Sequence, residues 1–118
     1  MRYALLIYNN SDALDQRSEE EARRVRAAIA EVLERPNVTG LVRLQGPGSA
    51  TTLRHDQGRT LLTDGPFLDS KDYLGGFVVV EAENLDGALA LADELQQLRG
   101  MIAPIEVRPV LEEPLVGA

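Results

Sequence analysis

The sequence predicts an α+β fold for these 118 residues, and three observations lead to it. Apolar runs rich in β-branched residues indicate strands, apolar residues at three- and four-residue steps indicate two amphipathic helices, and the two patterns alternate along the chain. The strands are expected at residues 3–8, 41–45, 76–82 and 105–110, and the helices at residues 18–35 and 84–99. With a predicted β-hairpin at residues 50–64 treated as an insertion, the order is βαββαβ, which is the ferredoxin-like arrangement.

The first half of the chain begins with a strand that is apolar at both alternating positions, and turn formers at residues 9–12 end it. Ser18 followed by Glu21 is a capping-box signature, which predicts where the first helix begins. Pro36 predicts its end, because proline cannot continue a helix.

The second half begins with the hairpin, whose strands at 51–54 and 59–63 flank a turn at 55–58. Asn84 is a favourable N-cap for the second helix, and Gly100 is a favourable residue just past its end. Pro109 predicts either the end of the last strand or an edge position in the sheet, because proline has no backbone N–H to donate to a neighbouring strand.

Composition argues against several classes of function. Twelve basic and nineteen acidic residues give a net charge of −7 without a basic stripe, so nucleic-acid binding is not expected. The absence of cysteine, a single histidine and the lack of a Walker-type loop predict neither a metal site nor a cofactor. Because every apolar run is shorter than the ~18–20 residues that span a bilayer, we expect a soluble cytoplasmic protein without membrane contact.

The strands at residues 4–7 and 77–80 carry apolar side chains on both faces, so both faces should be buried. Two helices can cover only one face of a four-stranded sheet. A second copy of the same sheet, related by two-fold symmetry, is the expected cover for the other face. The sequence therefore predicts a homodimer with its sheets face to face.

The sequence also resembles a known family. The stretches that carry the resemblance are MRYALLIY at the start, TDGPF at 63–67, LGGFVVVEAENLDGALALA at 74–92 and IEVRPV at 105–110. They are similar to the YCII-related family and, more narrowly, to its branch named after the Asp-Gly-Pro-Phe (DGPF) motif. The resemblance places one domain at residues 1–111 and leaves residues 112–118 as a C-terminal tail.

This resemblance implies a dimeric α+β barrel, in agreement with the order of the elements. Many members of the wider family carry a His-Asp pair in a pocket, and the aspartate of the motif corresponds to Asp64. The family histidine has no counterpart, because the one histidine, His55, lies in the predicted hairpin turn. Members of the DGPF branch often look like companions of extracytoplasmic-function sigma factors, which implies a regulatory role.

Asp64 is the first candidate for a functional residue. It opens the turn formed by TDGPF, where aspartate commonly accepts hydrogen bonds from downstream amides, so turn architecture by itself explains it. Facing a cavity, the same carboxylate could act as a general acid or base. The two roles are compatible.

Four more residues are candidates for ligand binding. Lys71 could pair with Asp64, neutralise an anionic ligand, or be a solvated surface residue. Tyr8 and Tyr73 combine an apolar ring with a polar tip, which suits both a pocket wall and the edge of a core. Arg108 shares a strand face with Glu106 and is expected to pair with a carboxylate or to bind an anion.

These residues lead to two hypotheses about function. In the first, a homodimer has a pocket near the DGPF turn that binds a small polar or anionic molecule, and Asp64 provides cofactor-free acid–base chemistry. In the second, the protein is a non-catalytic regulatory module whose partner is a transcription factor, with the tail segment PVLEEPLV at 109–116 as the contact.

Overall fold

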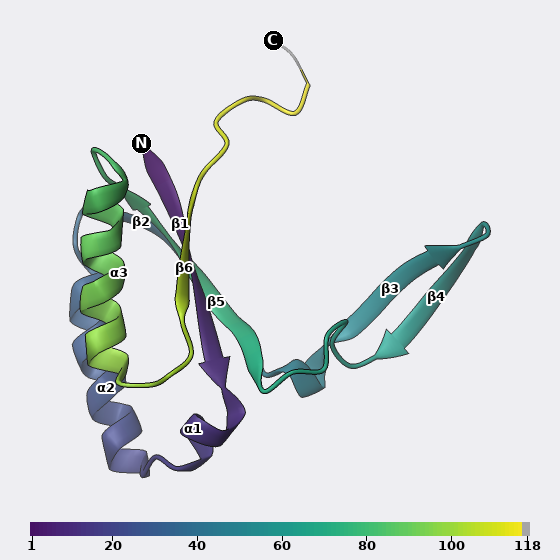
Figure 1. Cartoon of the computed structure of the whole chain (residues 1–118), viewed down its shortest axis with the longest axis horizontal. Coiled ribbons are helices and arrows are strands. Elements are labelled where there is room, and N and C mark those ends of the chain that lie inside the picture. Colours follow the sequence, from purple (N-terminus) through teal and green to yellow (C-terminus); the bar gives the residue numbers. More distant parts are fainter. Residues whose placement is uncertain (117–118) are drawn as a thin grey trace.

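The computed structural model describes residues 1–116, apart from the side chains of residues 14 and 15. Its strands and helices follow the predicted order (Figure 1). The strands are β1 (Arg2–Asn10), β2 (Val38–Arg43), β3 (Thr51–Asp56), β4 (Arg59–Asp64), β5 (Asp72–Glu81) and β6 (Ile105–Pro109). The helices are α1 (Ser11–Asp15), α2 (Glu19–Leu33) and α3 (Leu85–Arg99), with a 3-10 turn at Pro47–Ser49.

Four strands form an antiparallel sheet in the order β2-β5-β1-β6, and α2 and α3 lie on the same face of it (Figure 1). This confirms the ferredoxin-like α+β fold. It also confirms that β6, with its Pro109, is an edge strand. The central strand β1 places Leu5 opposite both Val78 of β5 and Val107 of β6.

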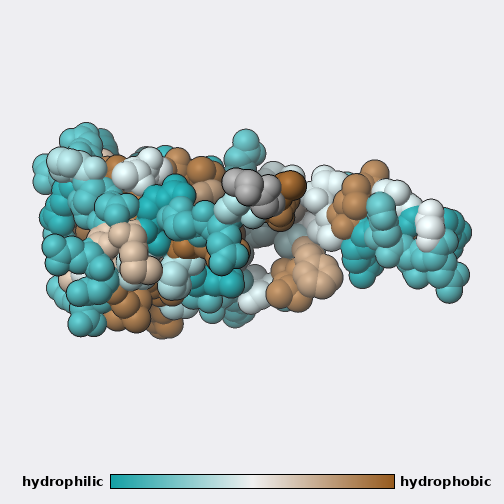
Figure 2. All heavy atoms as spheres, turned by 90° about the horizontal axis from the view of Figure 1, so that it is seen from above, coloured by the Kyte–Doolittle hydropathy of each residue, from teal (hydrophilic) through white to brown (hydrophobic). Residues whose placement is uncertain are grey.

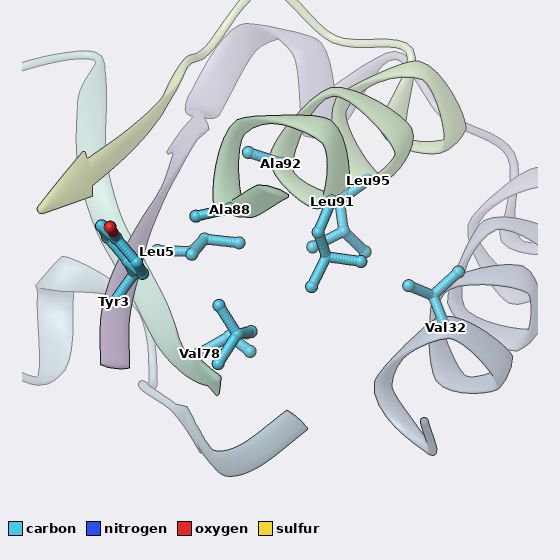
Figure 3. Close-up of a cluster of buried hydrophobic side chains, with 9 residues drawn as sticks. Tyr3, Leu5, Val32, Val78, Ala88, Leu91, Ala92 and Leu95 are labelled. Carbon is cyan, nitrogen blue, oxygen red and sulfur yellow. The ribbon is translucent and has the colours of Figure 1, made fainter. Parts of the chain in front are cut away.

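The core lies between this sheet and α3. Leu5, Val78 and Val80 are fully buried on the sheet, and Leu95 of α3 is almost completely buried against them. Figure 3 shows Leu91 and Leu95 pointing toward the sheet residues, while Val32 of α2 is set apart from them. Each large apolar side chain buried in this way contributes about 1.5–3 kcal/mol to the free energy of unfolding.

Local signals account for the helix ends. The Ser18 hydroxyl accepts a hydrogen bond from the backbone N–H of Glu21 at 3.1 Å, and the Asn84 side chain accepts one from the N–H of Gly87 at 3.1 Å. Gly100 adopts a left-handed conformation (φ 62°), as its predicted place after α3 requires. The caps therefore confirm the predicted start of both long helices.

Element boundaries differ from prediction. β1 runs on to Asn10, β2 spans Val38–Arg43, β5 begins at Asp72, and residues 11–15 form the short helix α1. The early part of β5 was not predicted as strand because charged and glycine residues interrupt its apolar pattern. Its pairing with β1 passes through a bulge between Ile7 and Tyr8, which lies opposite the two glycines, Gly75 and Gly76.

The inserted hairpin β3–β4 forms a sheet of its own and stands clear of the body as an arm (Figures 1 and 2). Its turn is tighter than predicted, with Gln57 (φ 49°) and Gly58 (φ 77°) between the strands, so His55 lies in β3 and not in the turn. The radius of gyration is 16.7 Å, whereas a compact domain of this length has about 13 Å. The arm therefore leaves the chain unusually extended.

Gly76→Ala is expected to lower the free energy of unfolding by about 1–3 kcal/mol. A Cβ added there would lie 2.4 Å from the backbone oxygen of Val42, and a backbone atom of a paired strand cannot move away easily. Gly48→Ala is the matched control, because nothing lies within 4 Å of its added Cβ. Urea unfolding of both variants measures the difference, and equal stabilities would contradict the proposed clash.

Candidate functional site

Asp64 is the last residue of β4, at the base of the arm, and is exposed. Its carboxylate makes neither a hydrogen bond nor an ion pair with any residue that the structure describes. The turn is held by other groups: the N–H of Gly65 donates to the carbonyl oxygen of Ala50 at 2.7 Å, and the Thr52 hydroxyl donates to the carbonyl oxygen of Gly65 at 2.8 Å. The Asp64 carboxylate is therefore not what holds the turn in this structure.

Lys71 and Tyr73 lie near the start of β5. The Lys71 ammonium donates to Asp12 Oδ2 at 2.8 Å, and both side chains are exposed. This hydrogen bond raises the pKa of Lys71. Tyr73 is half-buried and pairs with Asn9 of β1. The carboxylate that pairs with Lys71 is thus Asp12, and not Asp64.

Tyr8 and Arg108 lie on the sheet face that is turned away from the helices. Arg108 pairs in register with Ala4, and Glu106 pairs with Leu6, so both charged residues share that open face. The Tyr8 hydroxyl approaches Glu106 Oε1 at 3.4 Å, a long contact. The structure brings Tyr8 to Glu106, whereas Arg108 forms no ion pair with a carboxylate that the structure describes. No described side-chain hydrogen bond or ion pair joins Asp64, Lys71 or Tyr73 to either residue.

A cavity of about 660 Å³ lies elsewhere, between α2 and the sheet. It forms because α2 packs mainly against α3, with Arg35, just past the end of α2, in a bidentate ion pair with Glu94 of α3. Part of the apolar stripe of α2 therefore lines the cavity, while Val32 on the same helix is buried in the core. The main apolar side chains that line it are Ile7, Val25, Ile29, Leu33, Leu41 and Leu95.

Arg99 closes one end of this cavity. It is the last residue of α3, and only 5% of its surface is exposed. Its guanidinium donates to neutral acceptors: the carbonyl oxygen of Tyr8, Asn9 Oδ1 at 3.3 Å, Gln96 Oε1 at 2.9 Å and Met101 Sδ at 3.1 Å. The negative end of the α3 dipole also favours a cation at this position.

A second arginine, Arg17, lines the same end and donates to the carbonyl oxygen of Arg99. Burial, followed by the positive charge of Arg17, lowers the pKa of Arg99 to about 10. No carboxylate among the side chains that the structure describes forms an ion pair with either guanidinium. Burying a cation without a counter-charge is costly, so a bound anion at this end of the cavity would offset that cost.

Neither this cavity nor a smaller depression beside Gly100 is lined by Asp64, Tyr8, Lys71, Tyr73 or Arg108. In the described part of the chain, no group of three or more acidic or histidine side chains could hold a metal ion. No described helix is both long enough and apolar enough to cross a bilayer.

Comparison with known proteins places this sequence in a family. Residues 1–112 match the model of the YCII-related domain. The chain belongs to the YCII-related family. An uncharacterised protein of Rhizobium meliloti (strain 1021) is 35% identical over 114 residues, which cover 93% of this chain and 92% of that protein.

Sequence reasoning missed Arg99, although a signal for it was present. Ala88, Ala92 and Leu95 form the buried stripe of α3, and the next helical step along that stripe reaches Arg99. An arginine in the last turn of a helix is ordinarily explained by the helix dipole. This explanation hides the fact that Arg99 also lies on the buried stripe of α3. A charged residue on a buried stripe is the pattern that would have indicated this site.

Asp64→Ala is expected to change the free energy of unfolding by less than about 0.5 kcal/mol, because the exposed carboxylate has no described partner. Thr52→Val, which removes the hydroxyl that donates to Gly65, is expected to cost about 1 kcal/mol. Urea unfolding measures both changes. If Asp64→Ala costs as much as Thr52→Val, the carboxylate does support the turn.

Proposed function

We propose that this YCII-related protein binds a small anionic molecule in the cavity between α2 and the sheet, with Arg99 and Arg17 as the anion-binding residues. The observation that carries the proposal is that Arg99 is buried at the cavity wall while all of its described acceptors are neutral. The cavity volume of about 660 Å³ lies within the range of small-molecule sites.

The physical argument rests on charge compensation. Arg99 bears the desolvation cost of a buried cation, and Arg17 adds like-charge repulsion, which together lower its pKa. A carboxylate or phosphate placed between the two guanidinium groups would relieve both effects at once. Guanidinium groups suit these anions because their planar N–H donors match two oxygens simultaneously.

In this proposal the protein is a cytoplasmic homodimer. It belongs to the DGPF-motif branch of the family, because residues 64–67 read Asp-Gly-Pro-Phe. The open sheet face carries half-buried apolar side chains, among them Leu6, Phe77 and Val79, which a second copy would bury. The arm adds Leu53 and Leu62, which pair across the hairpin and are 60% and 67% exposed. Both features are typical of a chain that is completed by a partner copy.

A ligand site at the DGPF turn is a second candidate, with Asp64 as acid or base. It is supported by the exposed Asp64 carboxylate, which the turn does not use. In a single protomer this carboxylate lines neither described cavity, so a site there would need walls from a second protomer. Lys71, Tyr73, Tyr8 and Arg108 would be ligand-binding residues only in such a composite site.

A regulatory role alongside an extracytoplasmic-function sigma factor has its own support in the tail. Leu111, Leu115 and Val116 are 78%, 102% and 80% exposed. The beginning of the tail is held by the bidentate pair of Arg2 with Glu112, so the apolar residues that follow are presented outward. Residues 117 and 118 of the predicted tail lie outside the described residues.

Arg99→Gln is expected to abolish stabilisation by anions. For wild type, an anion at 100 times its Kd adds about 2.7 kcal/mol to the free energy of unfolding, a rise in Tm of roughly 10 °C in a domain of this size. A thermal-shift screen of small carboxylates and phosphates measures it. Arg23→Gln is the control, because Arg23 is exposed on the same helix as the cavity stripe and lines neither cavity.

The pH dependence provides an independent check on the same residue. Because the pKa of Arg99 is lowered to about 10, its charge is present below that pH and is lost above it. Stabilisation by the anion should fall as the pH rises through about 10, while the unliganded protein gains stability from this group. Wild type that responds to no anion, or an Arg99→Gln variant that responds normally, would refute the proposed function.

Val79→Glu is expected to convert the dimer to a monomer. Val79 lies between the buried Val78 and Val80, so its side chain is on the open face, where a carboxylate would be desolvated in the interface. Sedimentation velocity should give twice the 12.9 kDa chain mass for wild type and the chain mass for the variant. Leu89→Glu, at an exposed position of α3, should remain a dimer. Monomeric wild type at micromolar concentration would contradict the dimer.

A further inference from the structure

The shape of the cavity and the distribution of its charged and apolar residues indicate which kind of anion would fit it. This inference rests on the proposed function and concerns the part of the ligand that does not touch Arg99. We infer that the ligand is an elongated amphipathic anion, with a single carboxylate or phosphate at Arg99 and Arg17 and an apolar body lying along α2.

Three arginines gather at one end of the cavity, and its other charged lining residues are Arg26 of α2 and Glu34, the C-cap of that helix. Arg17 immediately precedes the cap of α2, and Arg99 contacts Tyr8 and Asn9 at the end of β1. Arg43 pairs in register with Gly76, which in turn pairs with Ile7, so this third arginine lies at the same end of the sheet. The positive end of the α2 dipole also lies there, and favours an anion.

The rest of the cavity is mainly apolar. Val25, Ile29 and Leu33 of α2 face Ile7 and Leu41 of the sheet across it. The stripe from residue 22 to residue 33 is about 16 Å long at the rise of an α-helix. A compact anion such as acetate or inorganic phosphate would leave this apolar wall in contact with water, whereas an extended alkyl chain would cover it.

A second depression in the surface adjoins the charged end of the cavity. A smaller depression is lined by Arg17, Arg99 and Gly100, so the two guanidinium groups border both this depression and the cavity. Glu21 also borders the depression, but Arg24 adds a further positive charge beside it. An anionic end group can therefore reach the arginine pair without crossing the apolar wall.

The test is a series of straight-chain carboxylates measured by isothermal titration calorimetry, with acetate, hexanoate and decanoate as probes. Burial of each added methylene should lower Kd by about fourfold until the cavity is filled. Decanol, which has the same chain without the charge, should bind at least tenfold more weakly than decanoate. Decyl phosphate compared with decanoate decides which end group is preferred.

Variants assign each part of the site. Arg99→Gln should reduce the affinity for decanoate to that for decanol. Arg17→Gln should also reduce this affinity, and it provides the test of the arginine pair if Arg99→Gln does not fold. Ile29→Phe places a larger side chain in the apolar part of the cavity, which reduces the space for the alkyl chain, and it should therefore weaken decanoate binding. Arg23→Gln should bind decanoate like wild type.

Each alternative outcome is decisive. If acetate and phosphate bind through Arg99 as tightly as decanoate does, the amphipathic ligand is refuted and the proposed anion-binding function stands. If decanol binds as tightly as decanoate and Arg99→Gln has no effect, the site is apolar and both inferences are wrong. If none of the probes binds wild type, both are likewise wrong.

Discussion

The hydrogen bond from Arg99 to the carbonyl oxygen of Tyr8 joins the end of α3 to the end of β1, the central strand of the sheet. The same guanidinium holds Asn9 and Gln96, and Gln96 in turn donates to the carbonyl oxygens of Met101 and Ala103. One buried cation thus fixes the junction of strand, helix and the following loop. It does so with neutral acceptors only, which is why a structural residue can also be the anion-binding residue.

The second constraint is that apolar surface exceeds what two helices can cover. α3 fills the core with Leu91 and Leu95, while α2 buries only Val32 there and lines the cavity with part of its apolar stripe. The opposite sheet face and the arm also keep apolar side chains exposed. Exposed apolar surface is unfavourable in water. The proposed ligand would cover the apolar wall beside α2, and the proposed second copy would cover the open sheet face.

The predicted site and the proposed site would both bind a small anionic molecule, but they lie at different places and use different residues. Sequence patterns drew attention to Asp64, where a motif marks a turn, but that carboxylate lies at the base of the arm. Arg99 belongs to no motif, and its role depends on contacts with residues about ninety positions earlier in the chain.

The order of elements, both helix caps and the edge position of β6 were predictable from the sequence, because each depends on residues within a few positions of one another. The early start of β5 was not, because its residues become strand only by pairing with β1. Tertiary structure alone decided which charges are neutralised. Lys71 finds Asp12, whereas Arg99 finds only neutral oxygens and a sulfur, since the distance to a counter-charge is set by packing between distant segments.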